Sequence, residues 1–156
     1  MKAFEALDMK GRLTLQKRNA ANEVLEELTV PNKIVLSGRK LIATMFVKSN
    51  EIKPFSYIAV GTGTTEPQAN DPQLQAEVFR KEITPVDLTK DISVEGDREK
   101  LRVSTELDFT EANDVPLTEA GLFNASVGGV MYNRVVFKPI NKTKDFKLTL
   151  IWEIQF

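Results

Sequence analysis

The chain has 156 residues, with 21 lysines and arginines against 22 aspartates and glutamates, so its formal net charge is −1. It contains no cysteine and no histidine, which excludes thiol nucleophiles, disulfides, histidine-dependent triads and metal sites built on either residue. The near-zero charge offers no electrostatic attraction to nucleic-acid phosphates, and no nucleic acid is expected as a partner.

A length near ~150 residues predicts one domain. We therefore expect a single domain over residues 1–156, with 1–30 as an N-terminal arm or extension and 31–156 as a β-rich core with a helix. The opening MKAFEALDMKGR has no apolar stretch suited to a signal peptide, and no run approaches the ~20 apolar residues of a membrane span. The expected protein is made in a cytoplasm and has no membrane partner.

The N-terminal third of the chain mixes strand-like and helical patterns. Residues 12–17 alternate as a strand does, and residues 22–28 fit a short helix. A longer helix is predicted over residues 29–48, with Thr29 as its N-cap and Pro31 in its first turn. It carries two apolar series at helical spacing, namely Ile34, Leu41 and Met45, and Val35, Ile42 and Phe46.

From residue 56 onward the apolar pattern has a period of two, which indicates strands. Strands are predicted over 56–60 and 78–84, separated by a loop in which Asp71-Pro72 opens one helical turn. Residues 89–99 are acidic, polar and typical of a turn region.

The C-terminal part of the chain alternates most clearly. Strands are predicted over 101–109, 118–124, 130–138 and 146–156, and Val127-Gly-Gly-Val130 is predicted as a hairpin turn. Because no long helices alternate with these strands, a parallel α/β sheet is disfavoured. The expected fold class is mainly β (α+β): an antiparallel β-sandwich or rolled sheet with one covering helix near the N-terminus.

Charge is distributed unevenly along the chain. The net charge is +4 over residues 1–60, −8 over residues 61–120 and +3 over residues 121–156. An acidic centre between basic ends fits a surface that meets other subunits. It also fits a solvated acidic loop region, and both interpretations stay open.

A glycine-rich stretch and a set of carboxylates are the candidates for chemistry. Gly61-Thr-Gly-Thr-Thr follows a strand but lacks the remaining residues of a P-loop or a dinucleotide fingerprint, so a tight turn with glycines at positive φ is expected. A glycosidase pair could be drawn from Asp108, Glu111, Asp114 and Glu119, and a calcium site from Asp108, Glu111, Asn113 and Asp114. The calcium set departs from EF-hand spacing, and we expect no catalytic residue, no cofactor and no metal.

Two further groups of residues have a structural interpretation. Glu77 and Arg80 are placed to form a bidentate ion pair, either within the subunit or with a neighbour, or else a simple surface pair. The aromatic residues Phe123, Tyr132, Phe137 and Phe146 are expected in the core.

The order of short motifs is more informative than any one of them. Gly38-Arg-Lys-Leu-Ile42 is followed by Tyr57-Ile-Ala-Val-Gly-Thr-Gly63, Pro67, Leu74-Gln-Ala-Glu77 and Arg80, and then by Leu117-Thr-Glu-Ala-Gly-Leu-Phe-Asn124, Phe137-Lys-Pro-Ile140 and Leu148-Thr-Leu-Ile-Trp-Glu-Ile154. This series, spread over residues 32–156, resembles structural proteins of bacteriophage tails. It is similar in particular to the N-terminal domain of tail-collar fibre proteins and to related proteins of contractile injection systems.

The resemblance implies a structural role, with Gly61, Gly63, Glu77, Arg80, Glu119, Gly121 and Phe123 as framework or assembly positions. Because no shaft or receptor-binding tip follows Phe156, an adaptor at the baseplate, neck or tail end is expected, either attaching a fibre or forming a ring. Its expected partners are other copies of itself and other tail or baseplate proteins. Its expected location is the virion tail or injection particle, assembled in the bacterial host cytoplasm.

Two other function classes stay open from the residues alone. A non-catalytic carbohydrate- or ligand-binding β-sandwich module predicts an exposed aromatic platform that includes Tyr57 or Tyr132. A carboxylate-dependent enzyme predicts a pair of Asp or Glu side chains in a cleft.

Overall fold

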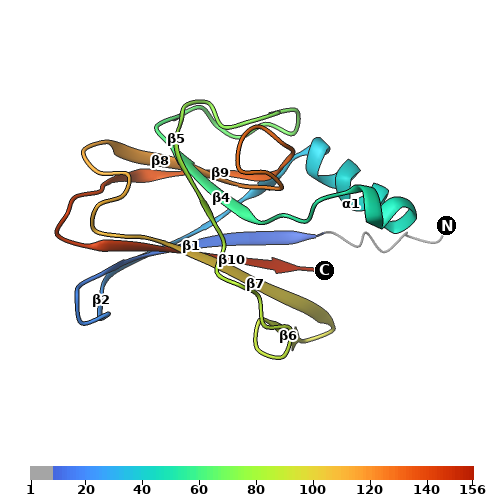
Figure 1. Cartoon of the computed structure of the whole chain (residues 1–156), viewed down its shortest axis with the longest axis horizontal. Helices are drawn as coiled ribbons and strands as arrows, with labels where there is room; N and C mark the ends of the chain where they lie inside the picture. The colour runs from blue at the N-terminus through green and yellow to red at the C-terminus, as the bar shows by residue number, and fades with distance from the viewer. Residues whose placement is uncertain (1–8) are drawn as a thin grey trace.

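The computed structural model describes residues 9–156, so the first eight residues of the predicted N-terminal arm lie outside the described residues. In this range two five-stranded antiparallel sheets face each other (Figure 1). Sheet A contains β1 (Lys10–Arg18), β2 (Val24–Pro31), β6 (Ile92–Glu95), β7 (Arg98–Leu107) and β10 (Lys147–Gln155). Sheet B contains β3 (Lys33–Ile34), β4 (Tyr57–Gly61), β5 (Glu77–Glu82), β8 (Pro116–Phe123) and β9 (Met131–Asn141).

The strand order is β2-β1-β10-β7-β6 in sheet A and β3-β9-β8-β4-β5 in sheet B. The expected fold class, a mainly β antiparallel sandwich with one helix near the N-terminus, is confirmed. β10 lies at the centre of sheet A, where it pairs with β1 on one side and with β7 on the other. The termini of the described chain therefore lie close together at one end of the sandwich (Figure 1).

The main core lies between the sheets and follows the period-two pattern of the strands. On β10, Leu148, Leu150, Trp152 and Ile154 are buried, whereas Phe156, beyond the strand, is 43% exposed. Trp152 is fully buried, and its Nε1 donates a hydrogen bond to Asn32 Oδ1 at 2.6 Å. The last predicted strand is thus confirmed together with the face that it buries.

The predicted short helix over residues 22–28 is wrong. Residues 24–31 form β2, which pairs antiparallel with β1 and places Thr29 opposite Thr14. The two threonine hydroxyls lie 2.9 Å apart and share a hydrogen bond. Pairing with β1 supplies backbone partners over the whole stretch, and this outweighs a local apolar spacing that also fits a helix.

The predicted long helix is confirmed only in its C-terminal part. Helix α1 spans Leu36–Lys48 and has Val35 as its N-cap, so Thr29 and Pro31 precede it in β2. Gly38 is the buried residue of α1, and a Cβ there would overlap the backbone of Tyr132 on β9. A glycine therefore lets the first turn contact β9 closely, and the rest of α1 extends from one end of the sandwich (Figure 1).

Three connections bear on the predictions for the middle of the chain. The predicted helical turn at Asp71-Pro72 is wrong, because the segment between β4 and β5 contains no helix. Residues 89–99 are not a simple turn region, since they contain β6 and its hairpin turn into β7. The predicted turn 127–130 lies within the β8–β9 connection, where Gly128 and Gly129 have φ values of 62° and 74°.

Candidate functional site

Glu119 on β8 holds the segment that joins β4 to β5, residues 62–76, which we call the β4–β5 loop. Because its neighbour Ala120 belongs to the core between the sheets, the Glu119 side chain faces away from sheet A. Its buried carboxylate accepts hydrogen bonds from the backbone N–H groups of Gly63 (3.0 Å), Gln75 (3.0 Å) and Ala76 (2.7 Å). One side chain thus satisfies three loop donors that lie beyond the ladder between β4 and β5.

Arg134 on β9 connects Glu119 to the carboxylate of Asp71 in the β4–β5 loop. Its Nε donates to Glu119 Oε2 and its Nη1 donates to Asp71 Oδ2, both at 2.9 Å. The Arg134 side chain is 2% exposed and that of Glu119 is 0% exposed. Arg134 and Glu119 stabilise each other, because an unpaired charge in a low-dielectric interior is strongly unfavourable.

Gly61 and Gly63 lie against the same carboxylate. A Cβ at Gly63 would be 2.5 Å from Glu119 Oε1, and a Cβ at Gly61 would be 2.6 Å from it. Neither glycine has a positive φ, so the expected turn conformation is wrong. Glycine is needed at these positions because the loop and the carboxylate approach closely.

Leu74 anchors the β4–β5 loop by an apolar contact. It is buried in a small cluster on the outer face of sheet B, together with Phe123 and Met131. Gly121 makes room for it, since a Cβ at Gly121 would lie 3.1 Å from Leu74 Cδ2 and 2.9 Å from the Asn133 carbonyl oxygen. The loop is therefore fixed to sheet B by both a charge network and an apolar side chain.

Arg80 on β5 fixes the β8–β9 connection, residues 124–130. Its Nε and Nη2 donate to the two carboxylate oxygens of Glu77 at 2.8 and 2.7 Å, the bidentate pair expected from the sequence. Its Nη1 donates to the carbonyl oxygens of Ala125 and Gly128, each at 2.8 Å. The guanidinium also lies 3.8 Å from the centroid of the Phe123 ring. This pair therefore acts within the subunit.

These contacts bring the seven positions singled out from the sequence into one layer on the outer face of sheet B. Glu119, Gly61 and Gly63 form one group, Glu77, Arg80 and Phe123 form another, and Gly121 lies between them. Sequence reasoning missed Arg134 and Asp71. The available signal for Arg134 was its position within the apolar run Met131–Phe137, where a buried arginine requires a carboxylate partner.

The stretch considered for calcium or glycosidase chemistry is organised around an ammonium group. Lys142 is buried, and its Nζ donates to Asp108 O, Asn113 Oδ1 and Thr143 O, each at 2.9 Å. Burial lowers the pKa of Lys142, although the nearby carboxylates of Asp108 and Glu111 act in the opposite direction. Two oxygen atoms of the residues considered for calcium, Asp108 O and Asn113 Oδ1, are therefore already bound by the lysine.

The acidic residues of this stretch do not converge. Glu111 pairs with Lys81 at 2.6 Å, and Glu119 belongs to the separate network with Arg134. Within residues 9–156, no group of three or more acidic side chains is arranged to hold a metal ion.

The aromatic residues lie mainly inside the sandwich. Phe123, Tyr132 and Phe137 are buried as expected, and Phe146 is partly buried against the core. Burial raises the pKa of Tyr132 to about 12. Tyr57 is half-buried beside the cluster that contains Phe123. The tyrosines therefore do not supply the flat exposed platform that a sugar-binding module predicts.

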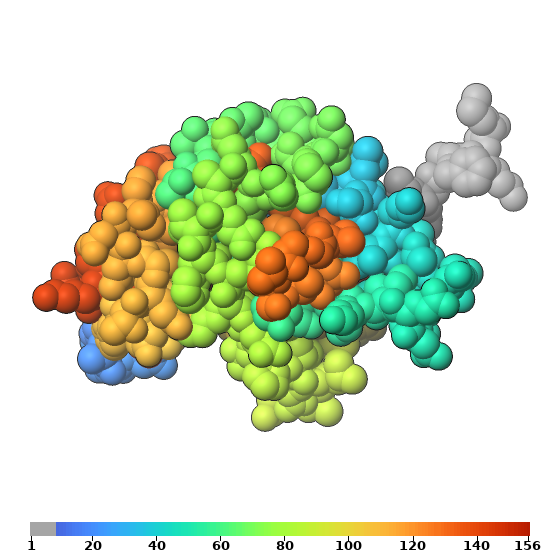
Figure 2. All heavy atoms as spheres, turned by 45° about the horizontal axis from the view of Figure 1, so that its top comes forward, coloured from blue at the N-terminus to red at the C-terminus, as the bar shows by residue number. Residues whose placement is uncertain are grey.

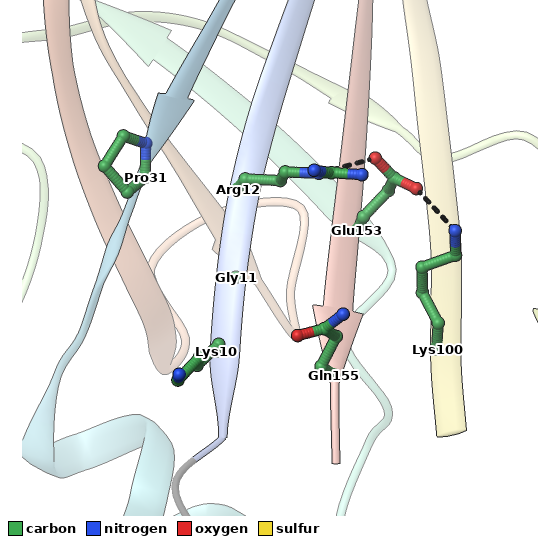
Figure 3. A pocket seen from close by; sticks show the side chains of 7 residues that line it. All are labelled: Lys10, Gly11, Arg12, Pro31, Lys100, Glu153 and Gln155. Carbon is green, nitrogen blue, oxygen red and sulfur yellow. Dashed lines mark hydrogen bonds and ion pairs between the residues drawn. The ribbon is translucent and has the colours of Figure 1, made fainter. Parts of the chain in front are cut away.

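The outer face of sheet A carries an open hollow of about 230 Å³ at the end where β1 begins and β10 ends (Figure 3). Glu153 lies in it between Arg12, at 2.9 Å, and Lys100, at 3.1 Å. Partial burial tends to raise the pKa of Glu153, but the bonds from Arg12 and Lys100 outweigh it and hold the pKa below its ordinary value. These three charges are paired with one another, which favours a role in joining strands over ligand binding.

Comparisons with known proteins give no relative for this chain. No family model matches it, no curated protein matches it and no solved structure matches it. Within the described residues, no helix is long and apolar enough to cross a membrane.

Proposed function

We propose that this chain is a structural component of a phage tail or a phage-like contractile injection particle. It acts there as a β-rich adaptor at the baseplate, neck or tail end, and it binds other copies of itself and other tail proteins. The proposal is supported by the structural role of the motif residues. The β4–β5 loop is held on sheet B by the Glu119 carboxylate and by its close contact with Gly61 and Gly63. The β8–β9 connection is held there by Arg80.

A layer fixed in this way suits an assembly protein. Preorganised loops lose little conformational entropy when a partner binds. A rigid surface therefore binds its partner with higher affinity than a flexible surface that makes the same contacts. Seven residues that carry the resemblance to tail proteins lie in the outer layer of sheet B, where they help to fix its two connections. This agreement between motif order and structural use supports the proposal.

The test is made on particles from a bacterium that carries the gene. Particles are purified by density gradient, the chain is identified by mass spectrometry, and immunogold electron microscopy locates it. We expect a constant number of copies per particle and gold label at one position on the tail. Deletion of the gene is expected to remove density at that position or to stop tail assembly.

An absence of the chain from gradient-purified particles, with intact particles formed by the deletion strain, would overturn the proposal. Complementation with the unaltered gene is the control for the deletion.

A further inference from the structure

Helix α1 presents an apolar and basic face to solvent. Its exposed residues Leu36, Arg39, Lys40, Ala43, Phe46 and Val47 follow the i, i+3, i+4 spacing that normally marks the buried face of a helix. Leu36 is 59% exposed, Phe46 is 87% exposed and Val47 is 80% exposed. We call Leu36, Lys40, Phe46 and Val47 the helix patch.

The hairpin of β6 and β7 presents a second apolar surface. Ile92 and Val94 lie on the face of sheet A that elsewhere packs against sheet B, since Ile92 is paired with the core-facing Leu101 and Val94 with Glu99. At β6 this face is uncovered, because Ile92 is 39% exposed and Val94 is 70% exposed. Together with Leu88, which is 69% exposed, they form the hairpin patch.

The segments that carry the two patches have opposite net charge. Residues 33–53, which include α1, hold five basic residues and one acidic residue, for a net charge of +4. Residues 85–99, which include β6, hold five acidic residues and two basic residues, for a net charge of −3. Exposed apolar side chains on segments of opposite net charge suit a specific protein contact.

The two patches occupy different parts of the surface. α1 extends from one end of the sandwich, and the β6–β7 hairpin projects from the edge of sheet A (Figure 2). A second copy of the chain can therefore supply the surface that each patch lacks.

We propose that the helix patch of one copy binds the hairpin patch of another copy. The inference rests on the proposed assembly role and deepens it by naming the partner and the two surfaces. Contacts between unlike surfaces repeat from copy to copy, so they build a closed ring or a longer array.

The experiment uses the full chain and three variants in sedimentation velocity at low and high protein concentration. The helix variant carries Phe46→Ser and Lys40→Glu, and the hairpin variant carries Val94→Ser and Glu99→Lys. The matched control carries Val24→Ser and Lys144→Glu, which change an exposed valine and an exposed lysine outside both patches.

We expect the unaltered chain and the control to self-associate and each patch variant to be monomeric, with association weakened at least about tenfold. A mixture of the two patch variants is expected to associate again, because each retains the patch that the other has lost. Circular dichroism checks that all variants keep the sandwich, since every substituted side chain is exposed.

An unaltered chain that stays monomeric, or a mixture that does not restore association, would overturn the inference. The outcome is separable from the test on particles. A monomeric chain that is present in tails overturns this inference alone, whereas a self-associating chain that is absent from tails overturns the proposed function alone.

Discussion

Glu119 and Arg134 form a buried ion pair across neighbouring strands of sheet B, with Arg134 Nε 2.9 Å from Glu119 Oε2. The register places Arg134 opposite Gly121, two residues along β8 from Glu119 on the same face. The guanidinium therefore reaches the carboxylate diagonally, past a residue that has no side chain. Oε2 accepts from both Arg134 and the Gln75 amide, and Oε1 accepts from the amides of Gly63 and Ala76.

Replacing Glu119 by glutamine should cost much of the stability of the fold. The substitution keeps the shape but removes the charge that balances Arg134. It also replaces one acceptor oxygen by an NH2 group, a donor that would face the N–H donors of Arg134 or of the loop. Breaking a buried pair in this way costs about 3 to 5 kcal/mol. Urea unfolding followed by Trp152 fluorescence measures the loss of stability. The control is Glu66→Gln, at an exposed loop position. Equal urea midpoints for the two variants would contradict the prediction.

The glycine at position 63 and the carboxylate of Glu119 should be energetically coupled. Gly63→Ala alone should cost about 1 to 3 kcal/mol, because the added methyl must push the carboxylate away. Once Glu119→Gln has broken the same bonds, the alanine should cost less. A double-mutant cycle measures this coupling, and strict additivity of the two changes would show that the contact is not shared.

Arg80→Lys should loosen the β8–β9 connection. A lysine cannot keep the bidentate bond to Glu77 while also bonding the carbonyl oxygens of Ala125 and Gly128. We expect a loss of about 1 to 3 kcal/mol and faster amide hydrogen exchange within residues 124–130. Arg102→Lys, at an exposed position of β7, is the matched control. Unchanged exchange in the Arg80 variant would refute this account.

Stability should be flat near neutral pH and fall in acid. The chain has no histidine, so no side chain has an ordinary pKa near ~6.5. The pKa values of Glu111 and Glu153 lie below their ordinary value of 4.5, because bonds from basic partners and a backbone amide outweigh burial. Their stabilisation is complete above the ordinary pKa and is lost as the pH falls through the lower folded value.

The pH dependence can be checked by urea midpoints measured from pH 3 to pH 8, a range chosen to span the carboxyl titrations. The double variant Glu111→Gln, Glu153→Gln should be less stable at neutral pH and should lose less stability in acid. A steep change in stability between about pH 6 and 7 in the unaltered chain would contradict the linkage argument.

The sequence predicts those parts of the fold in which one face of a strand is buried along its whole length. Residues 101–109 alternate strictly, and residues 146–156 alternate except at Ile151. Their strands, β7 and β10, were found in the expected places. The errors lie where local spacing permits two answers. The apolar residues around Leu28 fit a helix as well as a strand. Pairing with β1 decides between the two, and the spacing within residues 22–28 does not reveal that pairing.

The candidate site was predictable in a different way. Gly61, Glu119 and the other five framework positions were selected through a resemblance in motif order. The contacts that join them depend on how the strands of sheet B pair, which the motifs do not show. Asp71 gave no local signal, since an aspartate in a polar loop is ordinarily solvated. Arg134 did give a signal, because an arginine within a largely apolar strand must find an acceptor when that strand is buried.

The central position of β10 governs how the molecule forms during synthesis. β1 and β7 are separated along the chain by many residues, and neither has its inner partner until residues 147–155 have left the ribosome. Sheet A therefore closes late, through pairings of high sequence separation, which are slow to form. Until then the edges of β1 and β7 that pair with β10 have no partner, and unpaired strand edges favour aggregation.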